Sequence, residues 1–267
     1  MGFFKSSPVN AESTVFVEAA GLAWLAEAMP QGGARVVEVL SCDAEGLELE
    51  RIEQARPTAA AAEAFGAGLA RTHRSLAAQT RFGELPPDHP QNVPAYFGPA
   101  DQPLEMGTGT HSSWGDFHAR ERLDPLLARL RSLASADEFR VLEAARDRLA
   151  EGAADDDESP SRIHGDLWAG NVLWTPAEGE ASGVQAVLID PAAHAGHRET
   201  DIALLHLFGL PHLDAVLDGY EAVAPLREGW KARVPVHQFF CLAAHWVLFG
   251  SGYRCPTMEA AGAVLDL

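Results

Sequence analysis

The spacing of apolar residues changes near residue 55, from a mixture of strand and helix patterns to mostly helix patterns. Between residues 15 and 25, apolar side chains recur on one face of a helix that Asn10 can cap. The runs 34–40 and 46–52 are rich in strand-forming residues, and the second alternates apolar and acidic side chains. These patterns predict a helix followed by two strands, with residues 43–45 as the turn between the strands.

After residue 58 the pattern is helical, apart from a loop rich in Pro, Gly and Asn over residues 82–110. Ser135 and Glu138 form a capping-box pattern at the start of one helix, and the acidic run 155–158 predicts a solvated loop. Helices are predicted over 59–76, 114–133, 135–151, 199–207, 213–223 and 236–249. We therefore expect an α+β protein with a small N-terminal lobe, residues 1–55, and a larger helical lobe, residues 56–267.

The composition is that of an ordinary globular chain, with 47% hydrophobic and 22% charged residues. Lys and Arg number 20 against 38 Asp and Glu, which gives a formal net charge of −18. A protein this acidic repels phosphate backbones and anionic lipid surfaces, so we expect neither a nucleic-acid nor a membrane partner. Neutral or cationic substrates fit this charge better.

The cysteines Cys42, Cys241 and Cys255 are scattered and form no Cys-x-x-Cys pair, which argues against a disulfide framework or a zinc site. No apolar run approaches the ~20 residues that span a bilayer. The first residues lack the charged and then apolar layout of a signal peptide. We therefore expect a cytoplasmic protein.

The candidate chemistry lies in two short segments. His-Gly-Asp at residues 164–166 is followed by Asn171, and an apolar run over 187–189 ends in Asp190. Phosphoryl transfer needs a carboxylate to orient the acceptor hydroxyl and hard oxygen ligands to hold Mg²⁺ against the phosphates. Asp166 suits the first role, and Asn171 with Asp190 suits the second.

Each of these residues also has an ordinary structural interpretation. Asp166 or Asn171 alone would cap a loop, and Asp190 before Pro191 would end a strand. His164 is more typical of a residue that braces the loop than of a base. The combination nevertheless favours a kinase centre.

The same segments closely resemble a known family. His164-Gly-Asp-Leu-Trp-Ala-Gly-Asn171, Ile189-Asp-Pro-Ala192 and Gly196-His-Arg-Glu-Thr-Asp201 are similar to the fructosamine kinase (ketosamine-3-kinase) family, in the aminoglycoside and choline kinase branch of the protein-kinase-like fold. Trp114 and Phe117 with Glu121-Arg122-Leu123 resemble the substrate-side helix of that family.

The resemblance implies roles for individual residues. Asp166 would be the catalytic base, with Asn171 and Asp190 as Mg²⁺ ligands. Lys5 would bind the ATP phosphates, and Glu18 would be its ion-pair partner. The segment from Glu50 through Ile52 to Glu53 would be the hinge beside adenine, contributing backbone groups.

The acceptor candidates are Trp168, His197 and Glu199. Trp168 would stack on a sugar or simply pack, and Glu199 would meet a substrate amine or cap the following helix. Arg198 and Asp201 are expected to brace the catalytic loop as a structural pair.

The function implied is an ATP- and Mg-dependent kinase of a ketosamine, a sugar joined to an amine, acting in deglycation or metabolite repair. Two alternatives stay open: an aminoglycoside- or choline-type kinase, and a weakly active pseudokinase or binding module. The second arises because members of the family begin with two strands and a Gly-containing turn over the phosphates, whereas this chain begins at the lysine strand. A longer product with roughly 20–35 further residues before Met1 would supply two such strands.

Overall fold

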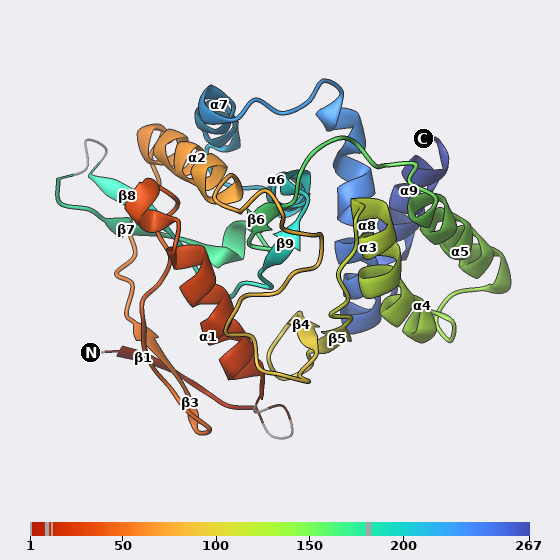
Figure 1. The fold of residues 1–267 in the computed structure, drawn as a ribbon, viewed down its shortest axis with the longest axis horizontal. Helices are drawn as coiled ribbons and strands as arrows, with labels where there is room; N and C mark the ends of the chain where they lie inside the picture. Colours follow the sequence, from red (N-terminus) through yellow and green to blue (C-terminus); the bar gives the residue numbers. More distant parts are fainter. Residues whose placement is uncertain (1, 9–10, 12, 180–182) are drawn as a thin grey trace.

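The computed structural model describes residues 2–8, 11, 13–179 and 183–267. Strands gather with three helices on one side of the molecule, and a bundle of helices forms the other side (Figure 1). The predicted cap Asn10 lies outside the described residues. The α+β class is confirmed.

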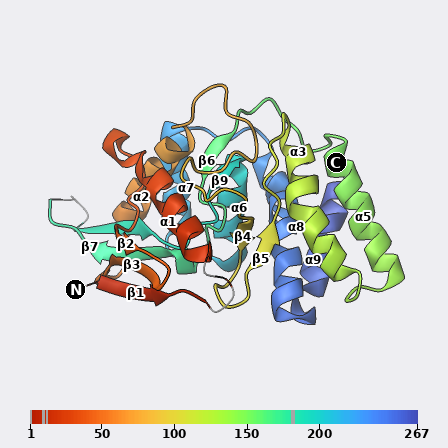
Figure 2. The same ribbon diagram turned by 60° about the horizontal axis from the view of Figure 1, so that its bottom comes forward.

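Three antiparallel strands form the N-terminal sheet in the order β1-β3-β2. They are β1 (Gly2–Ser6), β2 (Val39–Cys42) and β3 (Gly46–Glu50), with α1 (Ser13–Ala26) packed against the sheet (Figure 2). The predicted turn is confirmed, because Asp43 Oδ1 accepts the backbone N–H groups of Glu45 and Gly46 at 2.8 and 3.2 Å. The predicted strand over 34–40 is largely wrong.

The first part of that run pairs elsewhere. Val36 forms a parallel bridge with Leu188, where Val37 N–H donates to the Leu188 carbonyl at 3.0 Å and Leu188 N–H donates to Arg35 at 2.9 Å. The backbone before β2 is therefore tied to the hairpin β7 (Val172–Pro176) and β8 (Val184–Leu188). Two more strand pairs are β4 (Ala95–Phe97) with β5 (Leu104–Met106), and β6 (Ser161–Ile163) with β9 (His194–Gly196).

The predicted helices are confirmed with shifted ends, and the Ser135–Glu138 capping box is formed. Helix α9 (Arg254–Leu265), near the C-terminus, is not among the predicted helices. The helices after α1 are α2 (Ala59–His73), α3 (Trp114–Phe117), α4 (Asp124–Leu130), α5 (Ala136–Ala150), α6 (Arg198–Phe208), α7 (Leu213–Val223), α8 (Trp230–Phe249) and α9 (Arg254–Leu265).

The predicted helix over 114–133 is interrupted by a π-helical turn, His118–Leu123. Pro125 follows the turn and has no N–H to give to the carbonyl of Glu121, four residues earlier. That carbonyl accepts from Gly107 N–H at 3.0 Å and Arg122 Nη1 at 3.2 Å instead. The wider turn thus frees the Glu121 carbonyl from the helix to accept the Gly107 N–H.

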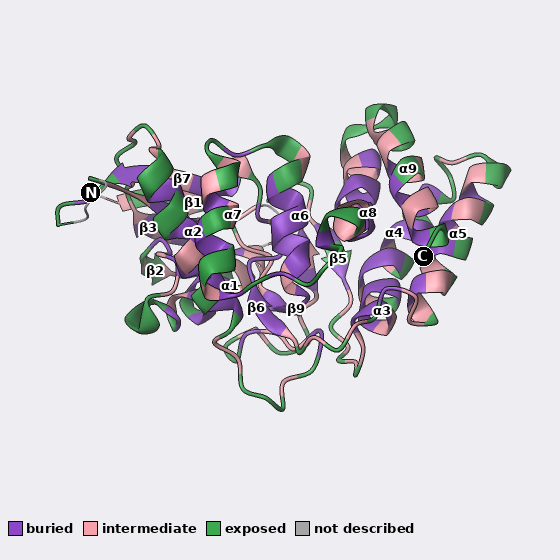
Figure 3. Cartoon of the chain, turned by 90° about the horizontal axis from the view of Figure 1, so that it is seen from above, coloured by how far each residue is buried: buried purple, intermediate pink, exposed green. Residues whose placement is uncertain are grey.

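Two hydrophobic cores lie in the described part of the molecule, and the division into lobes at residue 55 stays a prediction. One core joins the N-terminal sheet and α1 to α2, α7 and the β7–β8 hairpin. The other joins α3, α4 and α5 to α8, α9 and the β4–β5 hairpin. Helix α6 lies between them and is buried over most of its length (Figure 3). None of the described helices combines the length and apolar character needed to cross a membrane.

Candidate active site

The loop between β6 and β7 brings the predicted catalytic residues together. Asn171 is buried, and its Nδ2 donates to the Asp166 carbonyl at 2.8 Å and to the Asp166 carboxylate at 3.3 Å. The same Nδ2 lies 3.4 Å from the backbone oxygen of Asp190, which follows β8. Asp166, Asn171 and Asp190 therefore meet at one point, as the sequence predicts.

A buried carboxylate holds this loop from behind. Asp201, in the first turn of α6, accepts the backbone N–H groups of His164 and Gly165 at 2.7 and 2.9 Å. His73 Nε2 donates to it at 3.1 Å. His164 in turn bonds the Ile189 carbonyl through Nε2 at 2.8 Å, so it braces the loop against the strand that delivers Asp190.

Gly165 is required by the tight turn. Its φ of +81° is a conformation that L-residues rarely adopt, and a Cβ there would lie 2.2 Å from the Ala192 carbonyl oxygen. Asp190 also has a positive φ of 53°, which is uncommon for a residue with a side chain. The backbone at this point is shaped to aim two carboxylates rather than to continue regular structure.

Lys5 and Glu18 form the ion pair that the resemblance implies. Lys5 Nζ lies 2.7 and 2.9 Å from the two Glu18 oxygens and 2.9 Å from Asp190 Oδ1. The pair links β1 to α1 and brings one cation to the candidate metal ligand. The Asp190 side chain is 45% exposed and faces solvent on its other side.

Burial sets the protonation of the carboxyl groups in the cleft. It raises the pKa of Asp166 to about 7, with Asn171 opposing the shift and Asp190 adding to it. Burial also raises the pKa of Glu18 to about 7, against the attraction of Lys5. The pKa of Lys5 is raised although burial opposes its charge, because Glu18 and Asp190 attract the proton. The cleft therefore favours a carboxyl that exchanges a proton near neutral pH at Asp166.

The cleft around these groups has a cavity volume of about 260 Å³ open to the centres of water-sized molecules. Trp168 lines it and is 38% exposed. Its ring contacts Phe208 at 5.7 Å, Phe208 contacts His245 at 5.2 Å, and His245 contacts Phe249 at 5.2 Å. This aromatic wall was only partly foreseen from the sequence. His245 and Phe249 belong to no sequence motif that would mark them as binding residues. The exposed side chain of Phe249, which only the structure shows, is the one sign of its place in this wall.

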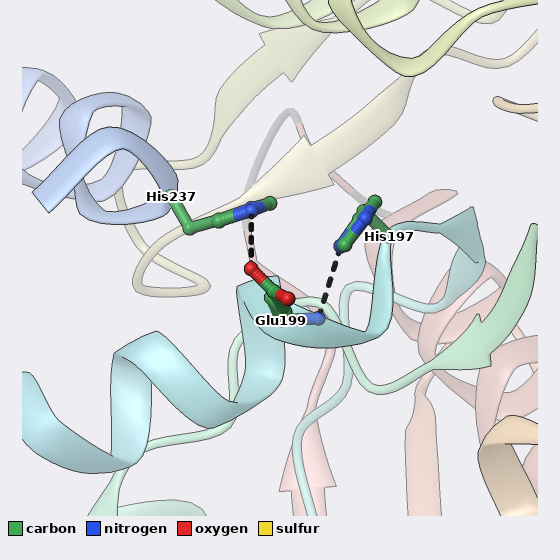
Figure 4. A group of neighbouring side chains, drawn as sticks. All are labelled: His197, Glu199 and His237. Atoms are coloured by element: carbon green, nitrogen blue, oxygen red, sulfur yellow. Dashed lines mark hydrogen bonds and ion pairs between the residues drawn. The ribbon is translucent and has the colours of Figure 1, made fainter. Parts of the chain in front are cut away.

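His197 and Glu199 lie elsewhere, in a buried ion-pair network (Figure 4). The Glu199 carboxylate accepts from the Arg233 guanidinium at 2.5 and 2.8 Å and lies 3.4 Å from His237 Nε2. His197 Nδ1 accepts the Glu199 N–H at 3.2 Å and so caps α6. Among the described residues, neither side chain lines the cleft. Of the three acceptor candidates, the structure brings only Trp168 into the cleft that Asp166 lines.

The same cluster has metal-like spacing, since the ligand atoms of His197, Glu199 and His237 lie within 4.8 Å of one another. Arg233 already occupies both oxygens of Glu199. Burial opposes the charge of Glu199, but the hydrogen bonds from His237 and Arg233 prevail and lower its pKa to about 2. The cluster is an ion-pair anchor of α6 on α8.

The hinge candidates lie at the end of the N-terminal sheet. The Glu50 carboxylate pairs with Arg35 at 2.9 Å and accepts the Glu38 N–H at 3.0 Å, while Ile52 packs on the N-terminal core. Within the described part of the chain, neither lines the cleft that holds Asp166. Their role beside adenine stays a prediction.

The acidic run was wrongly expected to be only a solvated loop. Asp156 lies 3.4 Å from His197 Nε2, and Glu158 binds Arg198 through Nε at 2.6 Å and again through Nη2. Arg198 therefore pairs with Glu158 and not with Asp201.

Comparisons with known proteins agree on one family. The sequence profile of the family described as fructosamine kinase matches residues 2–266. A crystal structure from Thermobifida fusca, provisionally assigned as a fructosamine-3-kinase, is 42% identical with a TM-score of 0.80, over 94% of this chain and 80% of that one. The "Probable ketoamine kinase HMPREF0351_12196" of Enterococcus faecium is 42% identical over 36% of this chain and 32% of its own length.

The match to curated relatives is partial in length, because this chain covers between 32% and 62% of the first eight of them. The ADP-bound aminoglycoside phosphotransferase APH(2'')-Ib matches at 14% identity and a TM-score of 0.51, over 87% of this chain and 75% of that one, and so shows the fold alone. The protein-kinase-like fold expected from the sequence is confirmed. With the profile match over nearly its whole length, the chain belongs to the fructosamine kinase family.

Proposed function

We propose that this protein is an ATP- and Mg²⁺-dependent kinase that phosphorylates a hydroxyl of a ketosamine. The observation that carries the proposal is the convergence of Asp166, Asn171, Asp190 and Lys5 on one cleft in a chain of this family. Relatives named as ketoamine kinases support the substrate class. The free thiols of Cys42, Cys241 and Cys255 agree with a cytoplasmic location.

The residues present fit a magnesium ion. Asn171 uses its Nδ2 for three contacts. Its side-chain oxygen makes no hydrogen bond within the described chain and is available as a ligand. Asp190 adds a half-exposed carboxylate that already has a cation, Lys5 Nζ, at 2.9 Å. Mg²⁺ prefers hard oxygen donors and takes few of them from protein. Bound there, it would neutralise phosphate charge and hold the γ-phosphate for transfer.

The chain's own groups then have defined tasks. Asp166 accepts a hydrogen bond from the acceptor hydroxyl and takes its proton, which a pKa of about 7 allows near neutral pH. Lys5, held by Glu18, supplies a positive charge to the phosphates. The aromatic wall of Trp168 and its neighbours presents faces on which a sugar or a cationic amine packs.

The product of such a reaction is a sugar-amine adduct carrying a phosphate, which is more labile than the parent adduct. The role we propose is therefore protein deglycation or metabolite repair.

The test is γ-phosphate transfer from ATP to a fructose- or ribose-derived ketoamine, compared with the free sugar, an aminoglycoside and choline. We expect the ketoamine to have the highest kcat/KM. Asp166→Asn should lower kcat by about 10²- to 10⁴-fold while the melting shift induced by Mg-ATP persists. Asp157→Asn, at an exposed site in the acidic run, is the matched control.

Equal turnover of free sugar and ketoamine would show that the amine is not recognised. Preferred turnover of choline or an aminoglycoside would move the protein to that class of kinase. Transfer to none of these acceptors, with ATP bound, would favour a pseudokinase or binding module.

A further inference from the structure

A second, smaller cavity lies behind the catalytic loop. Its walls come from α1, the β4–β5 hairpin, the π-helical turn and α8, and Gly165 of the catalytic loop closes one side. Val17, Tyr96, Phe97 and Ala192 line both this cavity and the cleft, so the two spaces adjoin. The cavity has about 30 Å³ open to the centres of water-sized molecules. One water needs roughly 10–15 Å³ on this measure, so a group of two or three polar atoms fits.

Arg122 places a positive charge in the wall of this cavity. It is only 5% exposed, and its guanidinium lies over the Phe117 ring at 4.6 Å. Nη1 donates to the carbonyls of Gly107 and Glu121 at 3.1 and 3.2 Å. Within the described residues, no carboxylate lies within ion-pair distance of Arg122, and both of its hydrogen bonds to the chain come from Nη1.

The carboxylate next to Arg122 in sequence is already in use. Glu121 accepts His111 Nε2 at 2.8 Å and the Gly109 N–H at 3.0 Å. Glu121 still attracts the Arg122 guanidinium from beyond ion-pair distance, but burial prevails and lowers the pKa of Arg122 to about 10. A buried guanidinium without a paired counter-ion is costly. Such a charge is consistent with a counter-ion that the protein does not itself provide.

The rest of the lining favours an anion as well. No Asp, Glu or Lys lines the cavity within the described ranges, whereas Glu18, Asp166 and Asp190 line the neighbouring cleft. His118 lines it too, is 2% exposed, and its Nε2 has no hydrogen-bond partner. Burial keeps the pKa of His118 well below its ordinary value, so this ring is neutral and Arg122 supplies the charge.

We propose that this cavity is an anion subsite that binds one small carboxylate group, with Arg122 as its counter-ion and the His118 Nε2–H as a second donor. Room for two or three polar atoms matches a carboxylate better than a phosphate with its four oxygens. The carboxylate comes from one of two sources. It belongs to the amino-acid part of a ketoamine whose sugar lies in the cleft, or it is a free small carboxylate.

Binding of a ketoamine's carboxylate rests on the proposed function, whereas binding of a free carboxylate does not. The first experiment therefore measures transfer to two ketoamines that differ only in charge, those of glycine and glycinamide. We expect kcat/KM to be at least about tenfold higher for the glycine adduct, because a charge-assisted pair with a buried guanidinium is lost in the amide. Arg122→Gln should bring this ratio close to one. Arg120→Gln removes an exposed arginine from the same turn and should leave the ratio unchanged.

The second experiment needs neither activity nor a folded variant. The wild-type chain is melted without ATP in rising sodium formate or acetamide, with sodium chloride holding the ionic strength constant. Formate should raise the melting temperature along a saturating curve, and acetamide should not. If the formate curve saturates and the two ketoamines have equal kcat/KM, the occupant of the subsite is a free carboxylate. If formate acts no differently from chloride and the glycine adduct is not preferred, the subsite does not exist. Failure to phosphorylate any ketoamine would overturn the proposed function and leave the formate result standing.

Discussion

At the scale of single residues, the position of the candidate base depends on a carboxylate that lies fully buried behind the loop. Asp201 is fully buried and satisfies two backbone N–H groups of the loop that carries Asp166. Burial opposes its charge, but the His73 hydrogen bond prevails and lowers the pKa of Asp201 below its usual value. It therefore stays ionised and keeps accepting both N–H groups across the physiological pH range.

Asp201→Asn should lower both stability and turnover, because an amide replaces one acceptor oxygen with a donor and leaves a loop N–H unpaired. A buried donor that loses its charged acceptor typically costs about 1–3 kcal/mol of the free energy of unfolding, and more where the acceptor is a carboxylate. We expect denaturant unfolding to show a loss of this size and kcat to fall more than KM for ATP changes. Asp218→Asn, on the exposed face of α7, is the control. A variant with unchanged kcat would show that the loop holds Asp166 without Asp201.

At the scale of elements, one hydrogen bond ties helix α1 to strand β4, and both elements line the cleft. Ser13, the first residue of α1, meets the Tyr96 hydroxyl of β4 at 2.8 Å. Phe97, the next residue of β4, packs on Phe240 of α8 with ring centroids 4.8 Å apart. Because α1 also carries Glu18, this contact connects the Lys5 ion pair to the helical core.

Tyr96→Phe and Ser13→Ala should each loosen α1 and raise KM for ATP by about two- to tenfold. This range corresponds to the loss of one hydrogen bond, which contributes about 0.5–1.5 kcal/mol. The double variant should be no worse than the more affected single variant, since both remove the same bond. Kinetics on the four proteins measure the coupling. Additive effects would mean that the two hydroxyls act independently.

Elements whose signal is local were predictable. The Ser135–Glu138 box and the Asp43 turn are confirmed because their partners lie within three residues. The run 34–40 was assigned to a strand, but its first half pairs with Leu188, a partner that sequence spacing does not reveal. The π-helical turn before Pro125 was missed because its cause, the carbonyl taken up by Gly107, lies on another loop.

The candidate site divides in the same way. Asp166, Asn171 and Asp190 lie in short motifs, and the structure brings them together. Arg198 was expected to pair with Asp201, three residues away, but binds Glu158, 40 residues earlier in the chain. Opposite charges that lie near each other in sequence suggest a pair, and only the tertiary fold decides between competing partners.

At the scale of the whole molecule, histidines spread over the fold share one property, a pKa lowered by burial. Trp114 stacks on His118 at 4.5 Å and contacts His237 at 4.4 Å between ring centroids. Burial is the leading cause that lowers the pKa of six histidines, to about 3 for His194 and about 4 for His237. The six are His118, His164, His194, His206, His237 and His245.

This histidine set gives the stability a definite dependence on pH. Between the lowered pKa values and about 6.5, the unfolded chain binds protons that the folded chain does not, so the free energy of unfolding falls as the pH falls. Glu18 and Asp166, with pKa values raised to about 7, oppose this trend, because their folded forms bind protons first. His118, His194 and His237, with the largest shifts, stay neutral in the folded chain over most of this interval and outnumber the two carboxyls, so we expect a net loss of stability from pH 6.5 to 4.5.

His237→Gln isolates one contribution to this loss. With a folded pKa of about 4, His237 steepens the dependence of the free energy of unfolding on pH by about 1.4 kcal/mol per pH unit between pH 4.5 and 6. The variant should be flatter by that amount in urea unfolding at several pH values, whatever its stability at pH 7. His212→Asn removes an exposed histidine at a left-handed position that Asn tolerates, and it is the matched control. Equal slopes for wild type and His237→Gln would mean that His237 gains its proton in the folded chain as readily as in the unfolded one, and the acid sensitivity would then have to arise from the other five histidines.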